Sequence, residues 1–231
     1  MKKLINGIVE FRKKLQPSYR ETFARLALGQ SPDALFIGCS DSRVAVNVFA
    51  STDPGDLFVV RNVGNLVPPC GIDGQSTADE SEAAAIEFAL GTLNVSNIII
   101  CGHSECAAMR TLAEGREKVP EKNFGNFRAW LRHGEKGLED LNSTSEIGKG
   151  LAKHNRLSQF NVLRQMENLK SYPIISERLK AGTLRLHGWW FDISLADVYA
   201  YEESAGIFML FDEEEAKRIY ARLDGTGSSF K

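Results

Sequence analysis

The chain has 231 residues, of which 43% are hydrophobic and 25% are charged, and its formal net charge is −2. This composition is typical of a globular protein, and the length suffices for one α/β domain with a substantial core. The small net charge gives no electrostatic footprint for nucleic acid, and no stretch approaches the ~18 apolar residues that a membrane span needs. We therefore expect a cytoplasmic protein with no nucleic-acid or membrane partner.

The first half of the chain alternates helical and strand patterns. Residues 2–28 carry apolar side chains at helical spacing and predict two helices, interrupted at Pro17. The segment Thr77–Glu80 has the spacing of a capping box and predicts the start of a helix that reaches about Leu93. Short apolar runs predict buried strands at 34–38, 57–60 and 97–101. Such runs are typical of a parallel sheet covered by helices on both faces.

The second half predicts longer helices and then late strands. Helical stretches are expected at 124–133, 152–170 and 212–223, with strands at 183–187, around 198–200 and at 207–210. Residues 225–231 are expected to form a loose tail. The fold class is therefore α/β: a single domain over residues 1–231, with a mostly parallel β-sheet flanked by helices, an N-terminal helical arm and late edge strands.

Four cysteines are too sparse for a disulfide scaffold in a chain of this length. They are expected to bind metal, to act chemically or simply to pack. Cys70 lies in a proline-containing loop and Cys101 ends a buried strand, so neither is assigned chemistry. His133 and His154 lie in charge-rich helical stretches, and we expect both side chains to be exposed.

Two segments directly follow predicted strands, Cys39–Arg43 (CSDSR) and Gly102–Cys106 (GHSEC). Ligand sites in open parallel sheets form outside the carboxyl ends of the strands, so the two segments should meet in one crevice. Two thiols and one imidazole make a three-ligand zinc set that leaves the fourth position open, as in catalytic sites. His-x-x-Cys alone is a weak signal, and a small buried hydrophobe is the ordinary role of a cysteine; the two segments together favour the metal.

These residues resemble the two signature motifs of the β-class carbonic anhydrases. The similarity covers about residues 20 to 195 and extends to the runs Arg61–Asn65 (RNVGN), Glu87–Ala89 (EFA) and His187–Trp189 (HGW). Two joined motifs of this length are a specific signal.

The resemblance implies that Cys39, His103 and Cys106 bind one zinc ion per chain and that Asp41 and Arg43 form the catalytic pair beside it. The implied activity is the reversible hydration of carbon dioxide to bicarbonate and a proton by zinc-bound hydroxide. It also implies a homodimer or a higher even homo-oligomer, with residues 1–28 used in dimerisation.

The resemblance further suggests the residues that contact the substrate. Phe58, Val63 and Phe88 match positions that line the apolar pocket, although plain core packing explains the two phenylalanines equally well. Gln30 matches a glutamine that hydrogen-bonds substrate in the plant-type, open-site subgroup; its alternative is a polar residue at a helix end. Ala107 stands where the family usually has glycine, beside the bound substrate.

A second subgroup can close its site by ligating zinc with the aspartate, and it usually has tryptophan where this chain has Phe36. With Gln30 present and that tryptophan absent, we expect the open subtype. Two alternatives remain for the activity. The same site could hydrolyse carbon disulfide or carbonyl sulfide, or Asp41 could be a fourth ligand in a zinc-stabilised binding domain without catalysis.

Overall fold

The computed structural model describes residues 1–78, 80–141 and 146–223. In this part of the chain the strands are β1 (Ala34–Cys39), β2 (Leu57–Asn62), β3 (Asn97–His103), β4 (Arg185–Asp192), β5 (Asp197–Glu202) and β6 (Ile207–Leu210). The α-helices are α1 (Lys2–Glu10), α2 (Gln16–Leu26), α3 (Val46–Phe49), α4 (Glu80–Gly91), α5 (Ala107–Glu114), α6 (Glu121–Trp130), α7 (Glu135–Leu141), α8 (Lys153–Lys170), α9 (Pro173–Lys180) and α10 (Glu213–Leu223). A π-helical segment (Phe11–Leu15) joins α1 to α2, and short 3-10 helices lie at Arg116–Lys118 and Leu131–Gly134.

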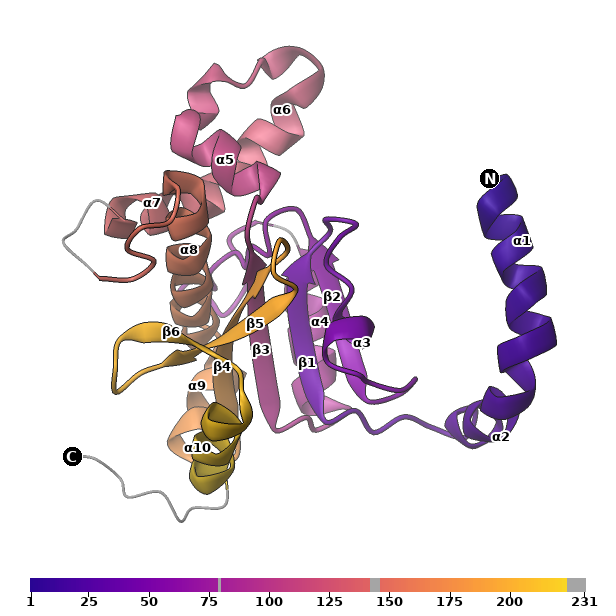
Figure 1. Cartoon of the computed structure of the whole chain (residues 1–231). Helices are drawn as coiled ribbons and strands as arrows, with labels where there is room; N and C mark the ends of the chain where they lie inside the picture. The colour runs from indigo at the N-terminus through magenta and orange to yellow at the C-terminus, as the bar shows by residue number, and fades with distance from the viewer. Residues whose placement is uncertain (79, 142–145, 224–231) are drawn as a thin grey trace.

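The strands form one mixed sheet in the order β2-β1-β3-β4-β5-β6 (Figure 1). β1 lies between β2 and β3 and is parallel to both, and β4 is parallel to β3. The last two strands are antiparallel additions at the edge. The predicted single α/β domain with a mostly parallel sheet and late edge strands is therefore confirmed.

The centre of the sheet is covered on both faces, which explains why its strands are continuous apolar runs. All six residues of β1 are buried. On one face, side chains of α4, α8 and α9 pack against Leu35 and Ile37. On the other face, Val46 and Phe49 of α3 pack against Phe36. Alternate residues of one strand thus serve two cores, as expected for a buried parallel strand.

The N-terminal arm projects away from the sheet (Figure 1). The structure has the two predicted helices, α1 and α2, but the chain stays helical between them, and the irregularity lies over Phe11–Leu15 rather than at Pro17. Pro17 lies in the first turn of α2, where its missing N–H leaves no bond unmade, and the π-helical segment before it absorbs the irregularity. None of the residues of α1, the π-helical segment or α2 is buried.

Two further expectations about helices need correction. α4 begins at Glu80, so Thr77 is not its N-cap; the Thr77 hydroxyl instead donates to the Pro69 carbonyl, 2.8 Å away. The stretch predicted as one helix at 124–133 is α6 followed by a 3-10 turn, with a kink over Lys122–Phe124. The predicted loose tail at 225–231 lies outside the described residues.

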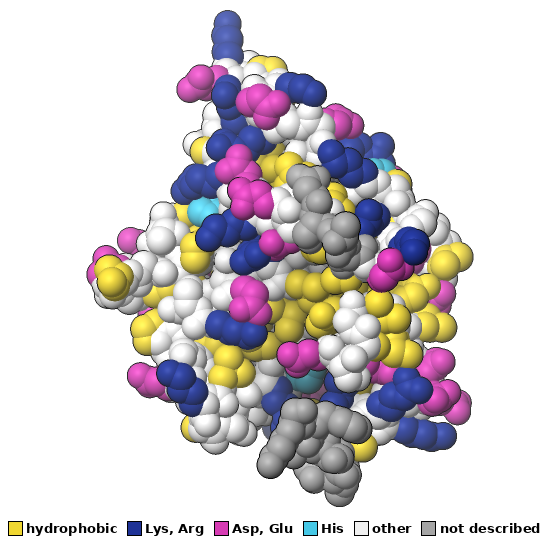
Figure 2. All heavy atoms as spheres, turned by 90° about the vertical axis from the view of Figure 1, so that its left-hand side faces the viewer, with side chains coloured by type: hydrophobic (Ala, Val, Ile, Leu, Met, Phe, Trp, Pro, Cys, Tyr) yellow, Lys and Arg dark blue, Asp and Glu magenta, His cyan; other side chains and the backbone are white. Residues whose placement is uncertain are grey.

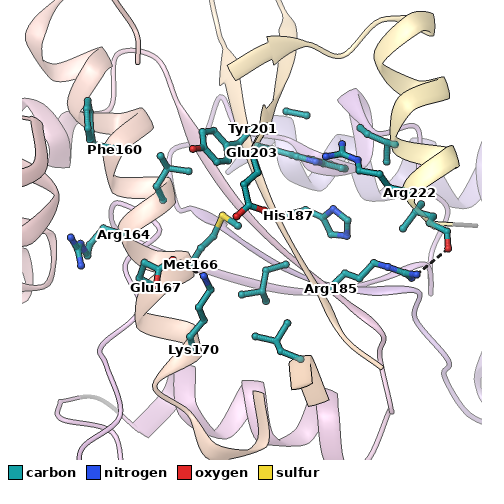
Figure 3. Close-up of a pocket in the computed structure, with 18 of the residues that line it drawn as sticks. Phe160, Arg164, Met166, Glu167, Lys170, Arg185, His187, Tyr201, Glu203 and Arg222 are labelled. Carbon is teal, nitrogen blue, oxygen red and sulfur yellow. Dashed lines mark hydrogen bonds and ion pairs between the residues drawn. The ribbon is translucent and has the colours of Figure 1, made fainter. Parts of the chain in front are cut away.

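β4 and β5 are paired from Trp189 and Ala200 to the turn that joins them. Beyond the Trp189–Ala200 pair the strands separate, and a cavity of about 730 Å³ opens there. Hydrophobic side chains gather on this face between charged ones (Figure 2). Figure 3 shows Met166 and Lys170 of α8 facing His187 and Arg222 across it. None of the cysteines lines this cavity. Over the described residues, no helix is long and apolar enough to cross a bilayer.

Candidate metal centre

The sheet brings the two predicted motifs together at the carboxyl ends of β1 and β3. β1 ends at Cys39 and the neighbouring parallel strand β3 ends at His103. Cys106 follows as the N-cap residue of α5, so its thiol lies at the positive end of that helix. The ligand atoms of these three residues lie within 4.8 Å of one another.

The histidine of this cluster has a defined tautomer. Its side chain is fully buried, and Nδ1 lies 2.8 Å from the Ser104 carbonyl oxygen, which can only accept a hydrogen bond. Nδ1 therefore carries the proton, and Nε2 presents a lone pair. Nε2 is buried and has no hydrogen-bond partner in the described structure. A buried imidazole nitrogen oriented in this way is a typical metal ligand.

The thiols of Cys39 and Cys106 lie close enough to shift each other's pKa in opposite directions. A hydrogen bond from Cys106 lowers the pKa of the Cys39 thiol far below its ordinary value. The same contact raises the pKa of Cys106, because a second thiolate would lie beside the first. The backbone amides of Asp41 and Gly64 also lower the pKa of Cys39. A divalent cation would replace the shared proton and remove the repulsion.

Zinc fits this donor set. Two thiolate sulfurs and one imidazole nitrogen are ligands that zinc prefers, and all three residues are at most 4% exposed. Three protein ligands leave one position for water or substrate. A binding domain with a permanent fourth ligand from Asp41 is disfavoured, because that carboxylate is already engaged by Arg43.

Asp41 and Arg43 form a bidentate pair next to the cluster. Arg43 donates from Nε to Asp41 Oδ1 at 2.9 Å and from Nη2 to Oδ2 at 2.7 Å. The hydrogen bonds from the Arg43 side chain, with a smaller one from its backbone N–H, hold the pKa of Asp41 well below its usual range. Arg43 Nη2 also donates to the Glu105 carbonyl at 3.1 Å, so the pair is tied to the histidine loop.

Several positioning residues were not identified from the sequence. Arg61 donates to the Cys39 carbonyl at 3.0 Å and to the Asp41 carbonyl at 2.7 Å, which fixes the backbone of the first motif. The Asn155 amide oxygen accepts from the Glu105 N–H at 2.7 Å, where Glu105 has a φ of 56°. Ser158 bonds both backbone groups of His103. The run RNVGN, which matches the family, could have indicated Arg61. No motif in the sequence indicates Asn155 or Ser158 of α8.

The expected substrate residues divide into two groups. Val63 precedes Gly64, whose N–H contacts Cys39, and Ala107 follows Cys106, so both lie by the cluster. Phe58 of β2 is in register with Leu35 of β1, which lies four residues before Cys39. The Phe58 ring packs at a tilt against Phe88, with a centroid distance of 5.8 Å.

Gln30 precedes β1 altogether and lies beside Leu26 and Gly55. Within one chain, therefore, Gln30, Phe58 and Phe88 lie toward the opposite end of the strands from the cluster.

The other histidines differ from expectation. His133 is buried, not exposed, because it packs edge-on against Trp130, and burial lowers its pKa to about 4. His154 is partly buried and bonds Glu105 at 3.1 Å. Cys101 is fully buried, and burial raises its pKa.

Comparison with known proteins gives the same assignment. The profile of the family described as carbonic anhydrase matches residues 34–198. A carbonic anhydrase of Synechocystis sp. is 41% identical over 207 residues, covering 87% of this chain and 71% of that protein. One from Pseudomonas aeruginosa is 34% identical over 220 residues, covering 94% of this chain and 95% of that protein.

Solved structures agree with the sequence relatives. The β-carbonic anhydrase CcaA superposes with a TM-score of 0.82 at 37% identity, covering 91% of this chain and 98% of that one. A structure from a study of two tetrameric β-carbonic anhydrases of Sordaria macrospora superposes with a TM-score of 0.71 at 28% identity, covering 85% and 94%. With its profile match, its relatives and its fold in accord, the chain belongs to the β-class carbonic anhydrases.

Proposed function

We propose that Cys39, His103 and Cys106 hold one zinc ion per chain and that Asp41 and Arg43 act beside it in the family's reaction, the reversible hydration of carbon dioxide to bicarbonate and a proton. The observation that carries this proposal is the convergence of two thiols and an unpartnered imidazole nitrogen next to an ionised carboxylate. Zinc, when bound, supplies the Lewis acidity that makes water a nucleophile near neutral pH.

The chain's own residues orient this reaction. Asp41 is kept ionised by Arg43, so its carboxylate is an obligate hydrogen-bond acceptor. In our proposal the Asp41 carboxylate accepts a hydrogen bond from the attacking water. This hydrogen bond turns a lone pair of the water oxygen toward carbon dioxide. One C–O bond forms, and the proton lost from water passes to solvent. The rigid Arg43 fork holds the carboxylate in place while this happens.

We further propose that the substrate pocket is completed by a second copy of the chain. Val63 and Ala107 would contribute from the same chain. Gln30, Phe58 and Phe88 would come from the partner, since their own cluster is out of reach. This is supported by the exposure of Phe88, which is 42%, and by the unburied arm that precedes Gln30. Homo-oligomeric assembly, with tetramers named among the structural relatives, agrees with it.

The open subtype and a cytoplasmic location remain proposals. The engagement of Asp41 by Arg43 rather than by the cluster supports an open metal position. Phe36 of β1, where the other subgroup has tryptophan, is buried against α3. Two thiols that must stay reduced to bind metal favour a reducing compartment.

The decisive experiment is stopped-flow carbon dioxide hydration from about pH 6 to 9, on protein whose zinc content has been measured. We expect one zinc per chain and activity that rises with pH, because two thiolates make zinc a weaker Lewis acid than imidazoles do. Asp41→Asn should keep its zinc and lose about 100-fold or more in kcat/KM, the contribution of a well-placed proton acceptor.

The matched control is Asp53→Asn, in an exposed turn, which should behave as the wild type. Full zinc occupancy without hydration at any pH would contradict the proposed function. Undiminished activity in Asp41→Asn would contradict the role given to the pair.

A further inference from the structure

The loop after β2 places a peptide amide on the metal-binding thiol. Gly64 N–H donates to Cys39 Sγ at an N···S distance of 3.4 Å, in a buried position. Gly64 has a φ of 86°, in the left-handed region that favours glycine. This unusual backbone conformation turns the N–H of the Val63–Gly64 peptide toward the sulfur.

The other end of the same peptide is held by a tryptophan. Trp130 Nε1–H donates to the Val63 carbonyl oxygen at 2.7 Å. Because the Val63 carbonyl and the Gly64 N–H belong to one amide group, Trp130 and Cys39 are bonded to its opposite ends. Each hydrogen bond of such a chain polarises the amide and strengthens the other. The indole therefore both orients the peptide and increases the positive charge that its N–H presents to the thiolate.

The next peptide is fixed independently. Asn161 of α8 donates from Nδ2 to the Gly64 carbonyl at 3.0 Å, and its side chain is fully buried. Gln165 supports Asn161 directly and Trp130 through His133. Its Nε2 donates to Asn161 Oδ1 at 2.9 Å and to the His133 carbonyl at 3.2 Å. His133 in turn packs against the Trp130 ring at a centroid distance of 5.4 Å. The two peptides that flank the Gly64 Cα are thus held from two separate elements.

We propose that Trp130, assisted by Asn161, is a positioning residue that sets the amide–thiolate hydrogen bond to Cys39 and thereby tunes the electron donation of that sulfur to the metal. The inference rests on the proposed role of Cys39 as a zinc ligand. Trp130 acts through the Val63–Gly64 peptide, at a distance from the metal itself. Replacing a residue that holds a metal ligand through hydrogen bonds typically changes metal affinity by about 10- to 100-fold.

The test uses full-length protein with cobalt in place of zinc, because the sulfur-to-cobalt charge-transfer band reports electron donation by the thiolates. Trp130→Phe keeps an aromatic ring but removes the N–H donor together with one of the two fused rings, and the same ring is lost in the control below. We expect its charge-transfer band to move to lower energy. Its zinc affinity, measured by competition with a chelator, should fall about 10-fold. Asn161→Leu is the second variant and should move the band in the same direction.

Trp189→Phe is the matched control, since Trp189 packs edge-on against Phe211, away from the cluster, and should leave band and affinity at wild-type values. A Trp130→Phe protein with wild-type band and affinity would overturn the inference, as would an equal shift in Trp189→Phe. Failure of the underlying proposal is recognised separately: the wild type would then lack the charge-transfer band, or Cys39→Ala would retain it unchanged.

Discussion

Gly64 is the residue on which the geometry of the metal centre depends most directly. Its φ of 86° is one requirement for glycine, and close packing is the other. A Cβ added there would lie 3.0 Å from the Ala108 Cβ and 3.2 Å from the Met109 Cε, at the start of the helix that follows Cys106. Any larger residue must therefore shift either the loop that carries the N–H or the helix that carries the second thiol.

We predict that Gly64→Ala lowers the unfolding free energy by about 1–3 kcal/mol and weakens zinc binding, because strain and overlap act together. The matched control is Gly182→Ala, which has a φ of 68° but nothing within 4 Å of the added Cβ. It should cost about 1 kcal/mol through backbone strain alone and leave zinc affinity unchanged. Denaturant unfolding at one protein concentration and chelator competition measure the two effects. Equal zinc affinity in both variants would contradict the role given to Gly64.

The residues of the candidate site were predictable to different degrees. Cys39 and His103 stand next to apolar strand runs, so sheet geometry alone brings them to one edge. Arg43 is two residues from Asp41, close enough for their pairing to be expected. Trp130 could not be identified, because its side chain bonds a backbone carbonyl 67 positions away and backbone carbonyls leave no mark in a sequence.

At the scale of elements, α8 carries an unusual polar stripe into the core. Ser158, Asn161 and Gln165 are each at most 1% exposed, although helices normally bury apolar side chains on their inner face. Their hydrogen bonds go to backbone groups of His103, at the end of β3, and of Gly64 and Val67, in the loop after β2. The helix therefore serves as the frame on which both loops are fixed.

We predict that Gln165→Met lowers the unfolding free energy by about 2–4 kcal/mol. The change keeps the side-chain volume but leaves the Val67 N–H and the His133 carbonyl buried without partners. Glu167→Met, two positions along on the exposed side, should stay within about 0.5 kcal/mol of the wild type. Chemical denaturation followed by circular dichroism measures both. A small change in unfolding free energy in Gln165→Met would mean that the buried polar side chains of α8 contribute mainly by packing and not by hydrogen bonding.

Strands were easier to predict than helix ends for a physical reason. A strand buried on both faces must be apolar at every position, and β1 and β3 satisfy this over nearly their whole length. The start of α4 depends on a local competition between hydrogen bonds, which the Thr77 hydroxyl resolves in favour of Pro69. The burial of His133 depends on the packing of its segment against α8, where Gln165 donates to the His133 carbonyl from 32 positions away, and no local pattern contains that contact.

At the scale of the whole molecule, the N-terminal arm leaves its apolar side chains uncovered in a single chain. Leu4, Ile8 and Leu15 are each more than half exposed along the arm. An isolated amphipathic helix of this length gains little stability by itself and needs an apolar surface to cover it. A second copy of the chain would cover the arm and could at the same time bring Gln30 and Phe88 to the first copy's metal centre.

We therefore predict that Ile8→Glu reduces the assembly to a smaller species in light scattering, because it places a charge on the face that the partner covers. Lys13→Glu, on the opposite side of the helix, is the control and should keep the native mass. Zinc should remain bound in both variants, since Cys39, His103 and Cys106 belong to one chain.

Carbon dioxide hydration should fall only in Ile8→Glu, and it should recover at higher protein concentration as the copies reassociate. An Ile8→Glu protein of native mass would contradict the role of the arm. A dissociated protein with full activity would instead show that the pocket needs no residue from a partner.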